Sequence, residues 1–285
     1  MDFAAPDAAH REEGRLEQLM ARKAGSAVFA SYNIHKCVGS DRRFDPHRVQ
    51  AVIGEIGADV IALQEADRRF GDRAGLLDLR ALGAATGLVP VPLSNKHRGH
   101  GHHGNLVLVR EATVRRLHQI NLPGLEPRGA LVADLDLAVG PVRVVAAHLG
   151  LLRHSRLLQV EALLAHAGDD TNRPVVFMGD MNEWRRERRS ALMRFPPGFG
   201  PISGVPSFPA YFPVLALDRV LAQPGELVER VDAHDTPLAR LASDHLPVKA
   251  VIRLDGTVPD SVVHPELPAL RRRILSRLRE ERPAV

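Results

Sequence analysis

The chain has 285 residues, of which 45% are hydrophobic and 25% are charged, a composition typical of a folded globular protein. Its single cysteine, Cys37, excludes an internal disulfide, and it contains no apolar run of the roughly 18 residues that cross a bilayer. The net charge is +4, but five arginines and two glutamates fall in 183–194 and six arginines and three glutamates in 266–285, which leaves −2 elsewhere. This distribution argues against a nucleic-acid footprint over the whole surface. Because the N-terminus lacks the basic and apolar segments of a signal peptide, we expect a soluble, cytoplasmic protein.

The predicted elements begin with a short polar helix at 9–23 and a strand at 26–34. Asp45-Pro46 starts a helix that ends near residue 57, because its apolar residues recur at helical spacing. A buried strand at 59–64 and a helix at 76–86, closed by Gly87, follow. The remaining core elements are strands at 103–110, 113–120, 129–137 and 141–148, a helix at 152–167, and strands at 175–178, 214–221, 227–232 and 246–253.

Consecutive strands with few helices favour an α/β (α+β) fold in which two mixed β-sheets pack together and helices flank them, a four-layer α/β/β/α sandwich. We expect one domain at 26–255, an N-terminal helical extension at 1–25 and a basic amphipathic C-terminal helix at 256–285. The last helix has leucines and an isoleucine on one stripe and arginines elsewhere. It could pack on the domain or make peripheral contact with an anionic membrane.

Six short polar words each end a run of apolar, β-prone residues. Strand ends that bring acids, amides and histidines to one rim are how an α/β enzyme assembles a metal-dependent hydrolytic site. The words are Ser-Tyr-Asn-Ile-His (31–35), Leu-Gln-Glu (63–65), Ala-His-Leu (147–149), Gly-Asp-Met-Asn (179–182), Leu-Asp-Arg (217–219) and Ser-Asp-His (243–245).

The order and context of these words, from about 26 to about 253, resemble the endonuclease/exonuclease/phosphatase superfamily with its DNase-I-like fold. The resemblance implies that Glu65 is the principal ligand of a Mg²⁺ or Mn²⁺ ion, and that Asp244 and Asn33 help to hold it. Oxygen donors of this kind suit a hard cation. Taken alone, Glu65 would more often be a strand-end acid paired with an arginine, and Asn33 could be a turn residue.

Asp180 and Asn182 lie two residues apart, so on an extended segment their side chains point the same way. Asp180 can then orient or deprotonate the attacking water while Asn182 donates to the transition-state phosphate. The resemblance implies that His245 contacts the scissile phosphate while Asp218 holds its imidazole, and that His148 lies on the opposite side of the phosphate. An Asp–His pair favours the charged imidazolium.

Two further residues are candidate substrate contacts. Asn105 follows a loop rich in histidine and glycine (96–105) and matches a family position that often touches phosphate. Arg128 enters a predicted strand and could clamp a phosphate oxygen, although a surface ion pair is an alternative. The loop could also bind zinc, but it has no cysteine and no helical pair of histidines.

These observations predict a divalent-metal-dependent phosphoester hydrolase, and we favour a phosphodiesterase whose substrate is a small molecule or a phospholipid headgroup. A nuclease acting on DNA or RNA is the second reading. It is weakened by a total of only three Trp and Tyr residues, which leaves few platforms for base stacking. A binding protein on an inactive hydrolase scaffold is a remote third. Whether one or two metal ions act stays open.

Overall fold

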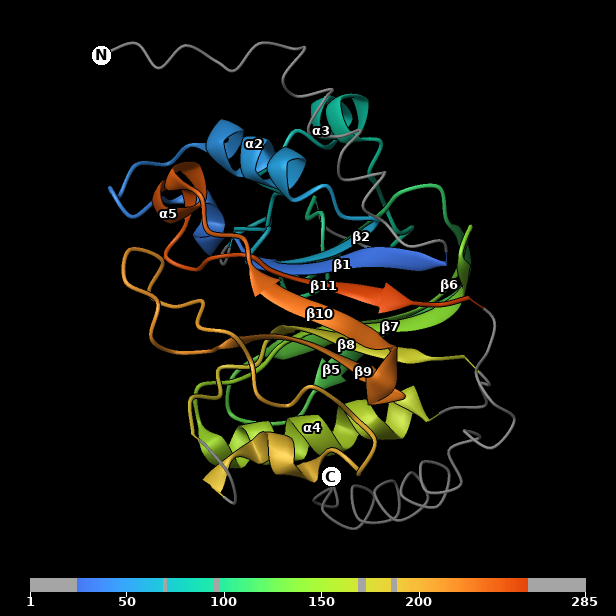
Figure 1. The fold of residues 1–285 in the computed structure, drawn as a ribbon. Coiled ribbons are helices and arrows are strands. Elements are labelled where there is room, and N and C mark those ends of the chain that lie inside the picture. The colour runs from blue at the N-terminus through green and yellow to red at the C-terminus, as the bar shows by residue number, and fades with distance from the viewer. Residues whose placement is uncertain (1–24, 69–70, 95–97, 169–172, 186–188, 256–285) are drawn as a thin grey trace.

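The computed structural model describes residues 25–68, 71–94, 98–168, 173–185 and 189–255. They form two mixed β-sheets packed face to face, with helices on both outer sides (Figure 1), which confirms the predicted sandwich. The helices predicted at 9–23 and 256–285 lie outside the described residues. Within the described part, no helix has the length and apolar character needed to cross a bilayer.

The first sheet has six strands in the order β10-β11-β1-β2-β4-β3. Only the β1–β2 pair is parallel, and the other neighbours are antiparallel. The strands are β1 Ser26–Asn33, β2 Val60–Gln64, β3 Val89–Pro90, β4 Leu106–Val109, β10 Val228–Ala233 and β11 Val248–Arg253.

The second sheet has five strands in the order β5-β6-β7-β8-β9. Here β7 and β8 are parallel, because the crossover between them runs through a helix, and the other pairs are antiparallel. The strands are β5 Thr113–Leu122, β6 Arg128–Leu137, β7 Gly140–His148, β8 Val175–Asp180 and β9 Asp218–Gln223.

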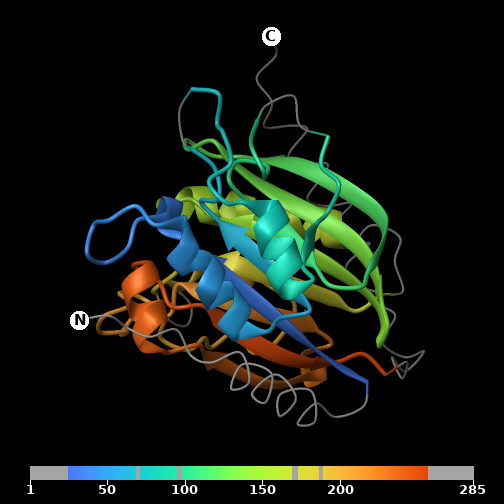
Figure 2. The same ribbon diagram turned by 90° about the horizontal axis from the view of Figure 1, so that it is seen from above.

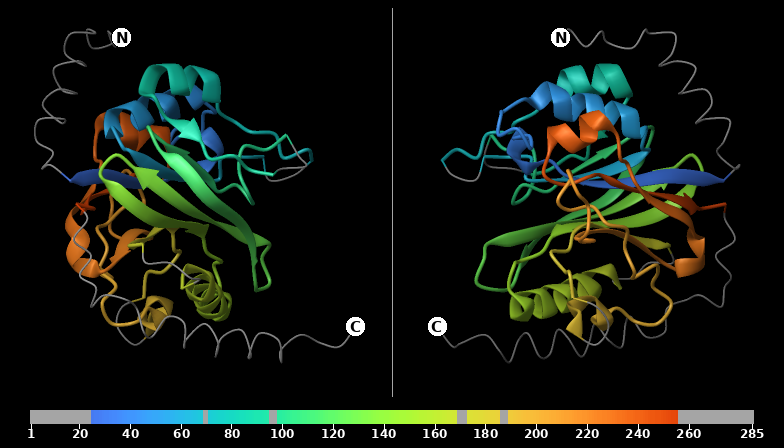
Figure 3. Two further views of the ribbon diagram at one scale, coloured as in Figure 1. Left: turned by 90° about the vertical axis from the view of Figure 1, so that its right-hand side faces the viewer. Right: turned by 60° about the vertical axis from the view of Figure 1, so that its left-hand side comes forward.

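Alternation of side chains along each strand builds the layers. In β1, Ala27 and Phe29 face the core between the sheets, while Ala30 and Tyr32 face the core beneath the helices α2 Pro46–Ile56, α3 Leu79–Thr86 and α5 Pro237–Ala242. Figure 2 looks down on these helices. Helix α4 Arg153–Ala167 covers the outer face of the second sheet, so that Figure 3 shows the two sheets between two helical layers.

The predicted helix after Asp45 is confirmed, since the Asp45 carboxylate accepts hydrogen bonds from the backbone of His47 and Arg48 and Gly57 ends the helix in a left-handed conformation. The strand predicted at 214–221 instead begins at Asp218. Val214 and Leu215 suggested burial, but they lie in a loop and are exposed by 52% and 36%.

Candidate active site

Strand register brings the polar words to one edge of the sandwich. In the second sheet His148 pairs with Asp180, and Asp180 pairs with Asp218, so three neighbouring strands present these groups side by side. In the first sheet Asn33 ends β1 beside Gln64, which ends β2. We call this edge, on the left in Figure 1, the catalytic edge.

Unusual backbone conformations aim the side chains at this edge. Gly179 has a φ of 153°, and any side chain there would place its Cβ 1.8 Å from the carbonyl oxygen of Ala147. Only glycine fits. Glu65 and Asn182 have φ values of 57° and 48°, in the left-handed region that costs free energy for a residue with a side chain. Such strain concentrates at functional sites.

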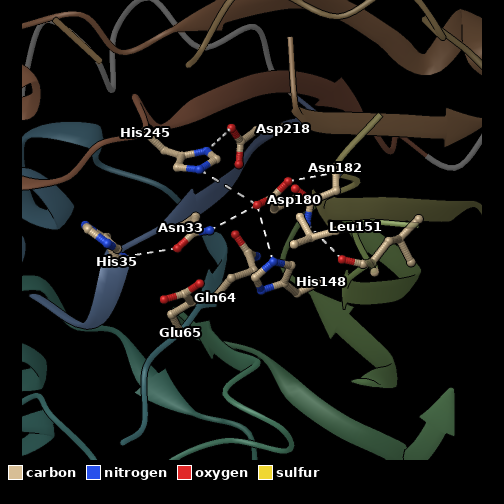
Figure 4. A network of polar contacts seen from close by, with 12 residues as sticks. Asn33, His35, Gln64, Glu65, His148, Leu151, Asp180, Asn182, Asp218 and His245 are labelled. Carbon is tan, nitrogen blue, oxygen red and sulfur yellow. Dashed lines mark hydrogen bonds and ion pairs between the residues drawn. The ribbon is translucent and has the colours of Figure 1, made fainter. Parts of the chain in front are cut away.

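The carboxylate of Asp180 is the centre of the cluster (Figure 4). Asn33 reaches across from the other sheet, and its Nδ2 donates to Oδ2 of Asp180 at 3.0 Å. The Nε2 atoms of His148 and His245 lie 3.4 and 3.9 Å from the same oxygen. Burial raises the pKa of Asp180, but the charges of both histidines and hydrogen bonds from Asn182 and Asn33 bring it below its usual range. Asp180 is therefore ionised at neutral pH.

His245 is held by a second carboxylate. Its Nδ1 lies 2.8 Å from Oδ2 of Asp218, and that oxygen also accepts a 2.6 Å hydrogen bond from Oγ of Ser207. Burial lowers the pKa of an imidazole, but Asp218 and Asp180 raise the pKa of His245 to about 10. His245 thus carries a proton, and a positive charge, at neutral pH.

His148 has the opposite character. Its side chain is 5% exposed, and within the described part of the chain no carboxylate pairs with it as closely as Asp218 pairs with His245. Burial lowers the pKa of His148 to about 4, although the charge of Asp180 opposes this shift. The cluster therefore contains one charged and one neutral imidazole on the same carboxylate.

Glu65 and Asp244 each contact a residue of the turn after β1. The ammonium of Lys36 pairs with Glu65, and Nδ1 of His35 lies 3.5 Å from Asp244. Burial raises the pKa of Glu65, but the hydrogen bond from Lys36 and neighbouring positive charges hold it below its usual range. The backbone nitrogen of His35 also donates to Oδ1 of Asn33 at 3.1 Å. The three predicted metal ligands therefore surround one turn.

A compact group that could hold a metal ion lies deeper. Asp180, Asp218 and His245 each offer a ligand atom, and these atoms lie within 4.8 Å of one another. In the structure Nδ1 of His245 is engaged by Oδ2 of Asp218, whereas Oδ1 of Asp218 is buried with no hydrogen-bond partner among the described residues. The side chains of Glu65 and Asp244, 23% and 36% exposed, are the more accessible donors.

The prediction that the segment through Asn182 is extended is wrong. The chain turns there, because Oδ1 of Asp180 accepts a hydrogen bond from the backbone nitrogen of Asn182 at 2.9 Å. Nδ2 of Asn182 donates to the carbonyl oxygen of Leu149 at 2.8 Å, which ties the segment after β8 to the one after β7. One amide proton of Asn182 is thus used within the protein.

The predicted substrate contacts lie at the margin. Nδ2 of Asn105 donates to the carbonyl oxygens of His102 and Gly129, so this buried amide holds the loop in place. Arg128 pairs with Glu126 at 2.9 Å, and its charge helps to lower the pKa of His148. Arg128 begins β6 at the end of the second sheet that carries His148, and Asn105, just before β4 of the first sheet, reaches that end through its bond to Gly129.

In the described residues 98–105 of the histidine-rich loop, the imidazoles contact neighbouring segments and hold the loop in place. Nε2 of His100 and of His102 contact the carbonyl oxygens of Leu77 and Ile120. His103 contacts the side chain of Asn121 at 3.0 Å. The rings of His102 and His103 touch edge to face, with centroids 4.7 Å apart, but Nε2 of each of the three histidines is engaged by a different protein acceptor, which does not favour a shared zinc ion.

Sequence reasoning did not identify a buried clasp beside the site. Arg156 of α4 is 1% exposed and faces both oxygens of the fully buried Glu183 at 3.4 Å. The same guanidinium donates to the carbonyl oxygens of Gly150 and Leu151. Glu183 directly follows the Gly-Asp-Met-Asn word, and that position was its only signal. The clasp fixes the segments that follow His148 and Asp180.

Comparison with known proteins agrees with the fold. Residues 30–245 match the model of the endonuclease/exonuclease/phosphatase family. No curated protein matched the chain. A solved endonuclease/exonuclease/phosphatase from Beutenbergia cavernae DSM 12333 is 23% identical, with a TM-score of 0.61, over 81% of this chain and 72% of that one.

Two other solved structures share the fold. A humanized D. rerio TDP2 is 15% identical, with a TM-score of 0.60, over 80% of this chain and 99% of that one. The mannosyl-6-phosphatase Bt3783 of Bacteroides thetaiotaomicron VPI-5482 is 15% identical, with a TM-score of 0.59, over 79% and 99%. The family model covers most of the chain, and the chain therefore belongs to the endonuclease/exonuclease/phosphatase family.

Proposed function

We propose that this chain is a divalent-metal-dependent phosphodiesterase whose substrate is a small molecule or a phospholipid headgroup. Members of its family are hydrolases of phosphoesters. The observation that carries the proposal is the convergence on Asp180 of Asn33, His148 and His245, which come from both sheets. A carboxylate between one charged and one neutral imidazole suits proton handling around a phosphate.

Glu65, Asp244 and Asn33 are the residues that we propose hold the ion, Mg²⁺ or Mn²⁺. They offer hard oxygen donors, and Glu65 is kept ionised beside the ammonium of Lys36. When bound, such an ion withdraws charge from a non-bridging phosphate oxygen. The remaining chemistry belongs to the protein's own side chains.

Asp180, ionised and hydrogen-bonded by Asn33, accepts a proton from the attacking water and orients it. His245 donates from a charged imidazolium that Asp218 keeps in place, which stabilises negative charge developing on phosphate oxygens. His148 and the second amide proton of Asn182 add neutral donors on the other side. Arg128, next to His148, supplies a fixed positive charge.

A nuclease stays as the second candidate because of one observation. A D. rerio TDP2 solved in complex with a single-stranded DNA product shares the fold, at 14% identity and a TM-score of 0.59. Of the two tyrosines, Tyr32 is fully buried, whereas Tyr211 and the single tryptophan, Trp184, are exposed and could stack on bases. We keep the diesterase as the first proposal because the net charge outside the basic segments 183–194 and 266–285 is −2, which argues against a broad nucleic-acid surface.

The test compares Asp180→Asn with Asp136→Asn, which makes the same change in a surface pair with Arg115 and Arg173. With bis(p-nitrophenyl) phosphate and Mg²⁺ or Mn²⁺, Asp180→Asn should lower kcat by about 10²–10³-fold or more, and Asp136→Asn should not change it. Glu65→Gln should also abolish the stabilisation of the protein by Mn²⁺ in thermal unfolding.

A monoester, phospholipid vesicles, plasmid DNA and RNA complete the substrate panel. Hydrolysis of plasmid or RNA without diester or lipid turnover would make the chain a nuclease. Metal-dependent hydrolysis that survives Asp180→Asn would contradict the assigned site.

A further inference from the structure

Large hydrophobic side chains are exposed in the loops and in helix α5 at the catalytic edge. Tyr211 and Phe212, before β9, are 70% and 66% exposed, and Leu151, after β7, is 65% exposed. Trp184 follows β8, Phe44 follows β1, and Leu241 precedes β11. We call these six residues the apolar rim. Monomeric proteins rarely keep such groups together on one side without a partner.

The side of the sandwich opposite the catalytic edge, where the other ends of the strands lie, provides a position for a control variant. Val89 of β3 is 53% exposed and pairs with Val109, which pairs with Val60 at the beginning of β2. Since β2 ends at the catalytic edge, Val89 lies at the far end of the sheet.

One half of the rim is a connected platform beside Asp244. The backbone nitrogen of Ser40 donates to the carbonyl oxygen of Leu241 at 3.0 Å, which joins the loop that carries Phe44 to α5. Arg240 of α5 donates to the carbonyl oxygen of Tyr211 at 3.2 Å. The backbone nitrogen of Ala210 donates to the carbonyl oxygen of Asp244 at 2.7 Å. These bonds hold the exposed aromatic rings next to a proposed metal ligand.

The other half lies across the site, beside His148 and Asp180. The backbone nitrogen of Leu151 donates to Glu126 at 2.7 Å, and its carbonyl oxygen accepts from Arg156. The Trp184 ring is covered on one face by the guanidinium of Arg185, 4.6 Å from the ring centroid. The apolar rim therefore flanks the catalytic groups on both sides.

Positive charge accompanies the rim. Arg42 and Arg43 are exposed in the loop before Phe44, and Arg153 is exposed just after Leu151. In the same loop Asp41 and Asp45 form ion pairs with Arg48, and Asp41 also feels the charge of Arg43. Exposed arginines next to apolar side chains match a surface that is anionic outside and apolar beneath.

We propose that the apolar rim docks the catalytic edge on an anionic phospholipid bilayer. Trp and Tyr rings favour the boundary between headgroups and acyl chains, and leucines contribute apolar area that cannot stack on a base. Docking of the rim rests on the proposed function in one respect: it would bring lipid phosphodiesters to the catalytic groups.

The experiment measures co-sedimentation of the full chain with vesicles in EDTA, so that no turnover occurs. Vesicles of phosphatidylcholine with about a quarter phosphatidylglycerol should bind it, and pure phosphatidylcholine should bind it more weakly. The double variant Tyr211→Ser/Phe212→Ser should lose about tenfold or more in affinity. Val89→Ser makes a similar change at the far edge and should bind like the parent protein.

Hydrolysis of bis(p-nitrophenyl) phosphate, measured separately, should be unchanged in the double variant, so a failure of docking and a failure of the proposed activity are distinguished. Absence of binding to anionic vesicles, or equal binding by the parent and the double variant, would overturn the proposal. Binding of a single-stranded oligonucleotide that the double variant loses, without vesicle binding, would assign the rim to nucleic acid instead.

Discussion

Two histidines on one carboxylate differ in charge because their second neighbours differ. His245 and His148 both approach Oδ2 of Asp180, and burial lowers the pKa of each imidazole. At His245, the hydrogen-bonded Asp218 and the charge of Asp180 together outweigh that burial, whereas His148 has the positive charge of Arg128 nearby. The site can therefore offer a charged donor on one side of Asp180 and a neutral imidazole on the other.

Replacing Asp218 by Asn should remove this difference. Without the carboxylate, burial dominates, so the pKa of His245 should fall from about 10 to near or below its ordinary value. The descending limb of the kcat profile should then move to lower pH, with a loss on the order of 10²-fold at alkaline pH. NMR titration of His245 measures the pKa directly.

The matched control is Glu55→Gln, which breaks the 3.0 Å pair between Glu55 and His234 on another part of the surface. It should leave the pH profile of kcat as in the parent protein. An unchanged pKa of His245 in Asp218→Asn would refute the role assigned to Asp218.

At the scale of elements, the helix α4 positions loops as well as covering a sheet. Through Arg156 and Gln159 its first turns bind the segment after β7, and through Arg156 they bind Glu183 after β8. A second fully buried arginine, Arg143, makes a comparable pair with Asp134 near the other end of α4. Only the first of these pairs touches loops that carry catalytic groups.

Arg156→Lys and Arg143→Lys should therefore lose similar amounts of stability but differ in activity. Each loses hydrogen bonds of a buried guanidinium and should lower the free energy of unfolding by about 1–3 kcal/mol. Arg156→Lys should in addition lower kcat about tenfold with little change in KM, because His148 and Asn182 would be less well placed. Equal kcat values for the two variants, measured where both are folded, would show that the clasp serves stability alone.

The sequence predicted those elements whose apolar pattern and burial coincide. Val175–Met178 is a continuous apolar run and forms the start of β8, and Asp45 and Gly57 mark the ends of α2 through their capping chemistry. The pattern failed where apolar residues are exposed, as at Val214 and Leu215. It also missed α5 and β3, which are too short to show a period.

The residues of the site likewise separate into those that the sequence predicts and those that it does not. Strand ends could be recognised from the polar words, because a strand ends where apolar residues stop. The clasp could not, since Arg156 meets Glu183 only after α4 has packed on the second sheet. The turn at Asn182 depends on a hydrogen bond to Asp180 that the spacing of two residues does not reveal.

At the scale of the whole molecule, the site exists only when the two sheets are packed. The hydrogen bond from Asn33 to Asp180 joins the ends of β1 and β8 across the seam, over the core that contains Phe29 and Val176. His148 is buried at the same seam. Protonation of this histidine is therefore linked to separation of the sheets, and so to global unfolding.

This linkage fixes a pH dependence of stability. The folded pKa of His148, about 4, lies below its ordinary value of 6.5, so between these values the unfolded chain binds a proton that the folded protein does not. Stability should fall as pH decreases through this window, by up to about 1.4 kcal/mol per pH unit, and His148 should contribute nothing above it. His245 contributes little over most of the window, because both states hold its proton once the pH is well below 6.5.

The free energy of unfolding, measured with urea in EDTA at several pH values, should depend less steeply on pH in His148→Gln than in the parent protein. His118→Gln, an exposed change on β5, should keep the parent slope. Identical slopes for the parent and His148→Gln would mean that this imidazole is not held neutral by the packed sheets.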